Sequence, residues 1–233
     1  MASRVPGRLG ERLEECGGLL QVALDLDDIA VAVRIGFQAA VSPAVVLEAG
    51  TPLVKVEGLR AARILRALPQ EPVVVADTKT FDTGRLEFTL AHRYGADAAT
   101  VLALAPDETI EEAVSAGEEL GMAVIGDLIG HPDPVEGARR LRRLGVHVAL
   151  LHIGIDVQRR LGITAGQIPD LVARVREAFQ GPVAVAGGVK PGEAGTLARA
   201  GAQIIVIGGA ITKASDPRGA AAEAVRNIRP GCP

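Results

Sequence analysis

The sequence is poor in aromatic residues. Only 2% of its 233 residues are Phe, Tyr or Trp, and Trp is absent, although 48% of the residues are hydrophobic. The core must therefore be filled by Val, Ile, Leu and Ala, which are typical of parallel strands buried on both faces. The length suits one α/β barrel or two small domains with a large core.

Other features are missing as well. No apolar run approaches the roughly 20 residues that span a bilayer, and the polar segment 1–18 lacks the apolar centre of a signal peptide. The 25 basic residues are scattered and the net charge is −3, which disfavours nucleic acid as a partner. The two cysteines, Cys16 and Cys232, have no metal-ligand spacing. We expect a cytoplasmic enzyme that binds neither nucleic acid nor membrane.

Apolar segments and helix-like segments alternate along the whole chain. Eight short apolar runs are separated by segments with helical spacing, at a period of roughly 25 residues, and no linker divides them. Alternation of this kind predicts a single-domain (β/α)₈ TIM barrel at 19–233 after a polar leader at 1–18. An open doubly wound sheet is the alternative. The expected strands are 20–26, 45–50, 98–103, 123–129, 148–153, 183–186 and 204–207, with one more starting at Val73; one of the expected helices is 57–68.

The run from Val73 to Asp82 contains the most informative polar residues. It begins as a buried strand and ends in three charged side chains, Asp77, Lys79 and Asp82. Because side chains alternate along a strand, Asp77 and Lys79 share one face, and Asp82 falls in the following loop. Charges of this kind are not tolerated inside a closed core. They indicate the floor of an active site; an ion pair that caps the strand is the structural alternative.

Further polar residues follow other expected strands, where a barrel places its chemistry. They are Asp25, Glu48, Asp127 and His152. Glu48 and Asp77 on adjacent strands suit Mg²⁺, with Mn²⁺ as a second option. Lys79 would stay protonated beside Asp77 and polarise an oxygen, so that an enediolate could be stabilised. His152 could move the proton, although a strand-end His is often a satisfied core residue.

Glycine pairs follow the last two expected strands, Gly187–Gly188 and Gly208–Gly209. Barrels often bind phosphate at this place, because backbone N–H groups can approach an anion closely there. The pairs therefore predict a substrate with a terminal phosphate, and tight turns are the alternative. The polar segment 154–166 is longer than the other connections, and both a lid and a passive surface loop fit it.

Motifs on every expected strand resemble the 3-hexulose-6-phosphate synthases of the orotidine 5′-phosphate decarboxylase suprafamily. The suprafamily signature Asp-x-Lys-x-x-Asp corresponds to Asp77, Lys79 and Asp82. The resemblance runs from about Leu20 to Ile228 and leaves out the leader. The motifs are Leu24-Asp-Leu26, Glu48-Ala-Gly-Thr-Pro52, Ala76-Asp-Thr-Lys-Thr-Phe-Asp-Thr-Gly84, Thr100-Val-Leu, Asp127-Leu-Ile-Gly130, His152-Ile-Gly-Ile-Asp156, Val185-Ala-Gly-Gly-Val-Lys190 and Ile207-Gly-Gly-Ala-Ile-Thr212.

This resemblance implies the reversible condensation of formaldehyde with D-ribulose 5-phosphate to D-arabino-hex-3-ulose 6-phosphate. It implies that Glu48 and Asp77 hold Mg²⁺ and that Lys79 and Asp82 complete the signature. His152 would serve in proton transfer, and we count Asp25, in the first of the motifs, with the catalytic residues. The family's enzymes are homodimers, in which the residue matching Asp82 reaches into the partner's site.

Three other functions stay open. The 3-keto-L-gulonate 6-phosphate decarboxylases share the metal and the enediolate, but they carry an Arg where Ala210 stands and another shortly after the His, where Ile155 and Asp156 stand. Orotidine 5′-phosphate decarboxylase uses no metal, so Glu48 would lack a purpose. A barrel that only binds a sugar phosphate is the third alternative, because fold does not imply activity.

Overall fold

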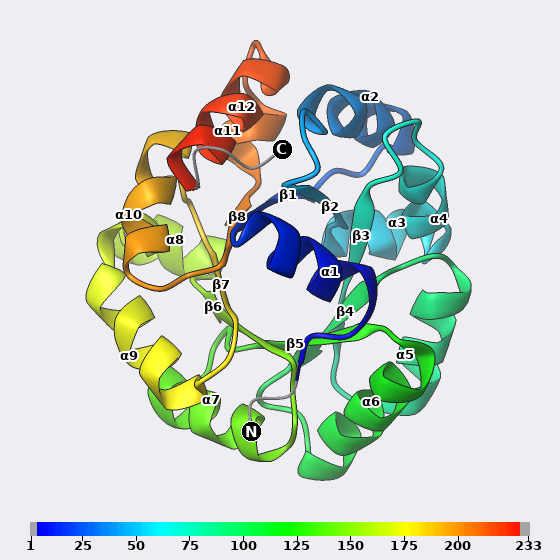
Figure 1. Ribbon diagram of the computed structural model, residues 1–233, viewed down its shortest axis with the longest axis vertical. Coiled ribbons are helices and arrows are strands. Elements are labelled where there is room, and N and C mark those ends of the chain that lie inside the picture. Colours follow the sequence, from blue (N-terminus) through cyan, green and yellow to red (C-terminus); the bar gives the residue numbers. More distant parts are fainter. Residues whose placement is uncertain (1–3, 229–233) are drawn as a thin grey trace.

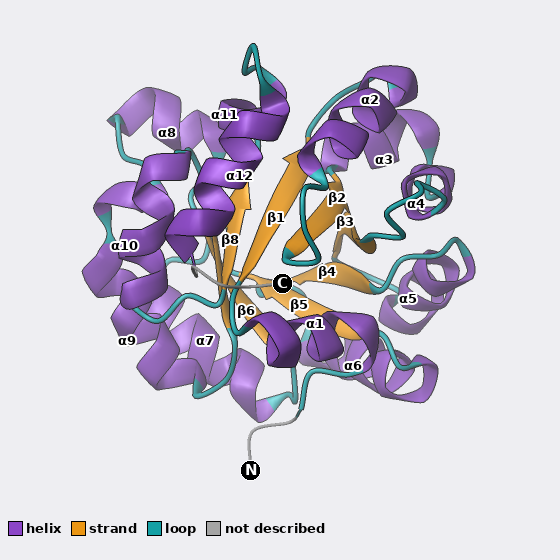
Figure 2. Ribbon diagram, turned by 45° about the horizontal axis from the view of Figure 1, so that its top comes forward, coloured by secondary structure: helices purple, strands orange, loops and turns teal. Residues whose placement is uncertain are grey.

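Eight parallel strands close into a barrel in the order β1 to β8, which confirms the predicted (β/α)₈ fold. The structure is a computed structural model that describes residues 4–228. Helices surround the ring of strands (Figures 1 and 2). Short strands rich in Val, Ile, Leu and Ala suit this architecture, because their two faces are both covered. Among the described residues, no helix is long and apolar enough to cross a membrane.

The strands and helices follow the expected alternation. The strands are β1 (Leu19–Leu24), β2 (Val45–Ala49), β3 (Val73–Thr80), β4 (Ala98–Leu102), β5 (Ala123–Asp127), β6 (Val148–His152), β7 (Val183–Ala186) and β8 (Ile204–Ile207). The helices are α1 (Gly7–Cys16), α2 (Ile29–Ala39), α3 (Thr51–Glu57), α4 (Arg60–Arg66), α5 (Gly84–Arg93), α6 (Asp107–Leu120), α7 (Pro134–Arg143), α8 (Ile155–Leu161), α9 (Pro169–Phe179), α10 (Ala194–Arg199), α11 (Gly209–Thr212) and α12 (Pro217–Ile228), with 3₁₀ turns η1 (Ala165–Gln167) and η2 (Pro191–Glu193).

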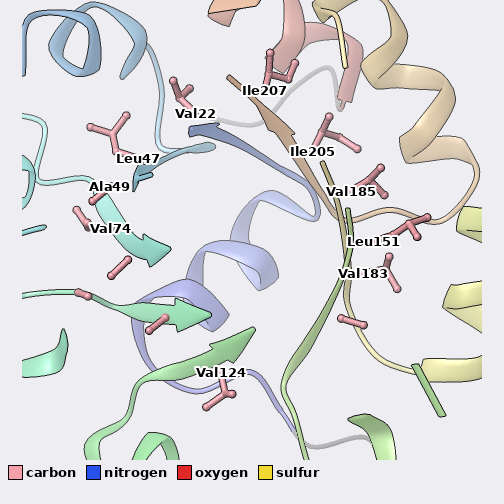
Figure 3. Packing of buried hydrophobic residues seen from close by; sticks show 14 of the residues in the cluster. Val22, Leu47, Ala49, Val74, Val124, Leu151, Val183, Val185, Ile205 and Ile207 are labelled. Carbon is pink, nitrogen blue, oxygen red and sulfur yellow. The ribbon is translucent and has the colours of Figure 1, made fainter. Parts of the chain in front are cut away.

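Alternating side chains along each strand form two separate apolar clusters. Residues such as Val22, Leu47 and Ile205 point away from the barrel axis and pack under the helices (Figure 3). Their neighbours, such as Val46 and Ile125, belong to a second cluster inside the barrel. The interior is therefore a packed core, and open space for chemistry is expected only where the strands end.

The segment before β1 forms a helix that sequence reasoning did not foresee. Helix α1 lies across the centre of the ring of strands (Figure 1) and buries Leu9 and Leu13 against the interior cluster. The guanidinium of Arg8 donates to the carbonyl of Glu71 at 2.7 Å and to Asp97 at 3.2 Å. The segment read as a polar leader therefore presents an apolar face to the base of the barrel, where the strands begin.

Two connections differ from the expected pattern. The helix expected at 57–68 starts later, as α4, and is preceded by the separate helix α3, which ends at Glu57 because Gly58 adopts a φ of 68°. Left-handed backbone of this kind favours glycine and interrupts a helix. The segment 154–166 forms α8 and the start of η1. None of the side chains of α8 is buried, so this short helix stands on the outside of the fold.

Candidate active site

The predicted polar residues lie at the carboxyl ends of the strands. Glu48 is in β2, Asp77 and Lys79 are in β3, and His152 is the last residue of β6. Asp25 directly follows β1. All five share the end of the barrel opposite α1, which we call the mouth.

Strand β3 is irregular at the residues that carry the charges. Ala76 pairs with Ala99, whereas Thr80 pairs with Val101, so β3 holds two extra residues relative to β4. Lys79 adopts a φ of 47°, which is unusual for a residue with a side chain. The hydroxyl of Thr100 accepts a hydrogen bond from the Lys79 amide at 2.9 Å and takes the place of a strand partner. Bulges and left-handed residues often re-aim side chains at active sites.

The ammonium group of Lys79 joins two carboxylates. Its Nζ lies 2.8 Å from Asp77 Oδ2 and 3.2 Å from Asp127 Oδ2. Burial works to lower the pKa of Lys79, but the charges of Asp127 and Asp77 outweigh it and raise this pKa above its ordinary value. Lys79 is therefore a fixed positive charge at neutral pH, as the sequence predicts.

Asp127 also holds His152. The imidazole Nδ1 of His152 lies 3.1 Å from Asp127 Oδ2, and the Ile129 amide donates to Oδ1 at 2.9 Å. Burial works to raise the pKa of Asp127, but the hydrogen bond from His152 and the charges of His152 and Lys79 outweigh it and lower this pKa. An ionised Asp127 can only accept hydrogen bonds. Nδ1 therefore carries the hydrogen, and the lone pair of a neutral His152 is on Nε2.

Sequence reasoning noticed Asp127 at the mouth but gave it no role, and it missed two threonines. Thr51 Oγ1 donates to Asp77 Oδ2 at 2.6 Å, and Thr100 Oγ1 donates to Asp77 Oδ1 at 2.8 Å. These hydroxyls fix both oxygens of the Asp77 carboxylate. Both stand in the motifs quoted above and could have been found by position, since Thr51 begins α3 just after β2 and Thr100 occupies an inward position of β4.

Three carboxylates at the mouth repel one another. The pKa of Glu48 is raised well above its usual value by burial and by the charges of Asp77 and Asp25, and the Gln21 hydrogen bond only partly opposes this. The pKa of Asp25 is raised by burial and by Asp77. Lys79 alone does not offset this negative charge, because it also pairs with Asp127.

This excess of negative charge fits a divalent cation held by Glu48 and Asp77. Within residues 4–228 no group of three or more His, Cys, Asp or Glu side chains is arranged to hold a metal by itself. A cation bound there would complete its shell with water and substrate oxygens, as Mg²⁺ commonly does. The two carboxylates would thus suit a hard cation whose other ligands are water and substrate oxygens.

The glycine pairs lie where the sequence places them, after β7 and β8. Gly187 and Gly188 have φ values of 116° and 70°. A Cβ at Gly188 would meet Gln158 and Thr164, so the segment that contains α8 packs directly on this turn. At Gly209, the first residue of α11, a Cβ would meet only the Lys213 side chain, at 4.0 Å. Space above the Gly209 backbone is therefore open to a ligand.

Asp82 is not part of the cluster within one chain. Its carboxylate accepts a hydrogen bond from the Thr83 amide at 2.7 Å and lines a shallow groove beside Leu86 at the start of α5. Phe81 and Leu86 are 52% and 57% exposed. The structure thus places Asp82 on the outer rim, next to exposed apolar side chains.

Comparisons with known proteins agree on one family. Residues 18–224 match the model of the Orotidine 5′-phosphate decarboxylase / HUMPS family. The chain is 38% identical over 204 residues to the 3-hexulose-6-phosphate synthase of Mycobacterium gastri. The matched region covers 88% of this chain and 96% of that protein.

Solved structures give the same result. A crystal structure of 3-hexulose-6-phosphate synthase superposes with a TM-score of 0.84 at 37% identity and covers 90% of this chain and 99% of its own. A crystal structure of KGPDC from Streptococcus mutans gives a TM-score of 0.82 at 25% identity. The superposition covers 90% of this chain and 96% of the KGPDC chain. Helix α1 precedes the residues that match the family.

Proposed function

The chain belongs to the Orotidine 5′-phosphate decarboxylase / HUMPS family, and we propose that this enzyme condenses formaldehyde with D-ribulose 5-phosphate. The product is D-arabino-hex-3-ulose 6-phosphate and the reaction is reversible, which makes the enzyme an aldehyde-lyase. The proposal follows the similarity to the 3-hexulose-6-phosphate synthases.

The observation that carries this proposal is the chain of contacts from Asp77 through Lys79 and Asp127 to His152. It places a permanent cation and a proton acceptor on the same buried carboxylate. The reaction needs both, because removing a proton from C1 of the sugar phosphate leaves negative charge on the oxygens of an enediolate. A passive sugar-phosphate-binding barrel has no need of such an arrangement.

The proton can be followed through the reaction. Nε2 of His152 takes the C1 proton, and the C–H electron pair becomes part of the enediolate, which Lys79 stabilises. C1 then attacks the carbonyl carbon of formaldehyde, a C–C bond forms, and the former aldehyde oxygen takes the proton back from His152. Asp127 keeps the imidazole in the tautomer that this sequence requires.

Further groups would orient the substrate. Glu48 and Asp77 would hold Mg²⁺ or Mn²⁺, and this cation would supply positive charge next to the substrate's oxygens. Asp25, which lies beside them at the mouth, would be a further catalytic residue. The backbone of Gly187, Gly188, Gly208 and Gly209 would receive the phosphate. The open space at Gly209 supports this placement.

The alternative reaction is decarboxylation of 3-keto-L-gulonate 6-phosphate, which the likeness to KGPDC keeps in view. A carboxylate leaving group calls for a nearby Arg. At the two positions where such an Arg would be expected, the chain has Ala210 and Ile155, both exposed beside the mouth. These small or apolar residues favour a neutral aldehyde as the second substrate.

We further propose a homodimer in which Asp82 of each chain completes the site of the other. The exposed apolar side chains beside Asp82 support this. Mixing the variants Lys79→Met and Asp82→Asn under conditions that exchange subunits should then restore activity to about a quarter of the wild-type value, because half of the dimers carry one intact site. Two inactive variants that stay inactive together in verified mixed dimers would contradict a shared site.

A direct assay decides between the two reactions. The enzyme is given ribulose 5-phosphate with formaldehyde and, separately, 3-keto-L-gulonate 6-phosphate, with Mg²⁺ present. We expect condensation, exchange of the C1 proton of ribulose 5-phosphate without formaldehyde, and little decarboxylation. Faster decarboxylation than condensation would overturn the proposal, and no turnover of either substrate would favour the binding barrel.

A further inference from the structure

Gln21 is a buried polar residue below Glu48 inside the barrel. It is only 2% exposed and lies in β1, where its register partner in β2 is Val46. Ala23, one inward step further along β1, pairs with Glu48. Gln21 is therefore one layer beneath Glu48, among interior side chains that are otherwise aliphatic at this level, such as Val46 and Val206.

The side chain of Gln21 reaches up to Glu48. Its Nε2 donates to Glu48 Oε2 at 2.7 Å. Its other polar atom, Oε1, is buried and has no hydrogen-bond partner among the described residues. An unsatisfied buried acceptor destabilises the fold. A Met or Leu side chain would suit the aliphatic surroundings without that cost, so the fold alone gives no reason for a glutamine here.

Glu48 depends on Gln21 more than the neighbouring carboxylates depend on any one partner. Asp77 is held by two threonine hydroxyls and by Lys79. Within residues 4–228, by contrast, the Glu48 carboxylate accepts a hydrogen bond only from Gln21, and only at Oε2. Without that bond its terminal torsion would be broad and poorly defined.

Building on the proposed metal-dependent function, we propose that Gln21 is a positioning residue for a divalent cation. The amide nitrogen of Gln21 fixes Glu48 Oε2 and leaves Glu48 Oε1 available as a metal ligand at the mouth. Gln21 touches neither the substrate nor the cation in this scheme; it acts through Glu48. Partners that orient metal ligands in this way typically change metal affinity 10–100-fold when they are removed.

The test uses Gln21→Met, which keeps the length of the side chain and removes the donor. Binding of Mn²⁺ to the metal-free protein is measured by calorimetry, and thermal unfolding is measured on the same samples. We expect the Kd for Mn²⁺ to rise by roughly tenfold or more. We expect the metal-free Tm to change little, because removal of the unsatisfied Gln21 oxygen offsets the loss of the hydrogen bond to Glu48.

A matched control is Gln203→Met. Gln203 immediately precedes β8, at the base of the barrel, and its Oε1 is also buried without a partner among the described residues. This variant makes the same chemical change far along the barrel from Glu48. We expect the Kd for Mn²⁺ to stay at the wild-type value. In a Glu48→Gln background, Gln21→Met should have no further effect, because its action passes through Glu48.

The outcomes separate the two proposals. If the wild-type protein binds no Mn²⁺, the metal-dependent function fails. If the wild type binds Mn²⁺ and Gln21→Met binds it equally well, only the inference on Gln21 is overturned. If Gln203→Met loses affinity for Mn²⁺ to the same extent, the inference on Gln21 is also overturned. The same holds if the loss of affinity occurs only together with a lowered metal-free Tm in both Gln21→Met and Gln21→Leu, because Gln21 then has a structural role.

Discussion

At the base of the barrel the interior side chains are aliphatic and α1 covers them, whereas at the mouth Asp25, Glu48, Asp77 and Asp127 share the same ring of strands with a single Lys79. The difference lies in how polar groups are treated. His147, near the base, is kept neutral, since burial lowers its pKa to about 4 and its Nδ1 accepts the Val124 amide. At the mouth, burial and the charges of neighbouring carboxylates raise the pKa of Glu48 and Asp25.

This contrast separates stability from chemistry along one axis. Burial of apolar groups at the base stabilises the fold, while like charges at the mouth cost free energy unless a ligand offsets them. Substitutions at the base should therefore change unfolding and leave turnover intact. Substitutions at the mouth should change turnover, and removing one of the like charges there should stabilise the metal-free fold.

The largest effect is expected for Lys79→Met. The variant removes the cation that would stabilise the enediolate, and removing one such group commonly costs 10²–10³ in rate. We expect kcat/KM for the condensation to fall by roughly a thousandfold. Lys55→Met, an exposed change on α3, should keep full activity. A Lys79→Met enzyme with near-wild-type turnover would remove Lys79 from the mechanism.

The next effect concerns the base. Leu9→Ala truncates a fully buried side chain of α1, and such changes cost about 2–5 kcal/mol. We expect the free energy of unfolding in urea to fall by this amount while kcat is retained. Leu161→Ala, at a site that is 62% exposed, should change it by less than about 0.5 kcal/mol. A large loss of kcat in folded Leu9→Ala would show that the two ends are coupled.

The sequence predicts the barrel well because its evidence is local and repeated. Each apolar run and each helical stripe signals its own element, and eight repeats of one unit predict closure. The failures occur where tertiary contacts decide. Helix α1 has only a short apolar stripe, including Leu9 and Leu13, and this stripe is buried by contacts with the base of the barrel, which the segment itself does not reveal. Gly58 divides α3 from α4 through a backbone conformation that periodicity does not show.

The site is predicted in part for a similar reason. The sequence predicts that Glu48, Asp77 and Lys79 lie together, because strand ends and the alternation of side chains can be recognised in each segment without knowing which segments it contacts. The partners of the charged groups come from other elements, so the local pattern does not pair Thr51, Thr100 or Gln21 with the carboxylates that they contact. The left-handed Lys79 and the two extra residues of β3 are likewise properties of the β3–β4 pairing.

A third prediction follows from His147. In the folded protein its pKa is lowered to about 4, from an ordinary value of 6.5. A histidine that is neutral when folded binds its proton more readily when unfolded, so its contribution to stability is present above pH 6.5 and is lost as pH falls towards 4. That difference corresponds to about 3 kcal/mol. The free energy of unfolding in urea is measured for metal-free wild type and His147→Gln between about pH 7 and pH 4. We expect it to fall more steeply with falling pH in the wild type than in the variant.

The smallest effect on stability is expected for Glu48→Gln. The pKa of Glu48 is raised in the folded protein by burial, Asp77 and Asp25, so its contribution to stability is present below the ordinary pKa of 4.5 and is lost as pH rises through the folded value. Without metal, ionised Glu48 therefore destabilises the fold at neutral pH. The introduced glutamine keeps an oxygen that Gln21 can bond and removes the charge, so we expect the metal-free Tm at about pH 7.5 to rise by a few degrees, corresponding to about 1–2 kcal/mol. The difference from wild type should shrink as pH approaches 4.5.

Saturating Mg²⁺ should raise the Tm of the wild type but not of the variant, whose condensation activity should be lost. A Glu48→Gln protein that is less stable than wild type at this neutral pH, both without metal, would show that the mouth, like the base, is built for stability.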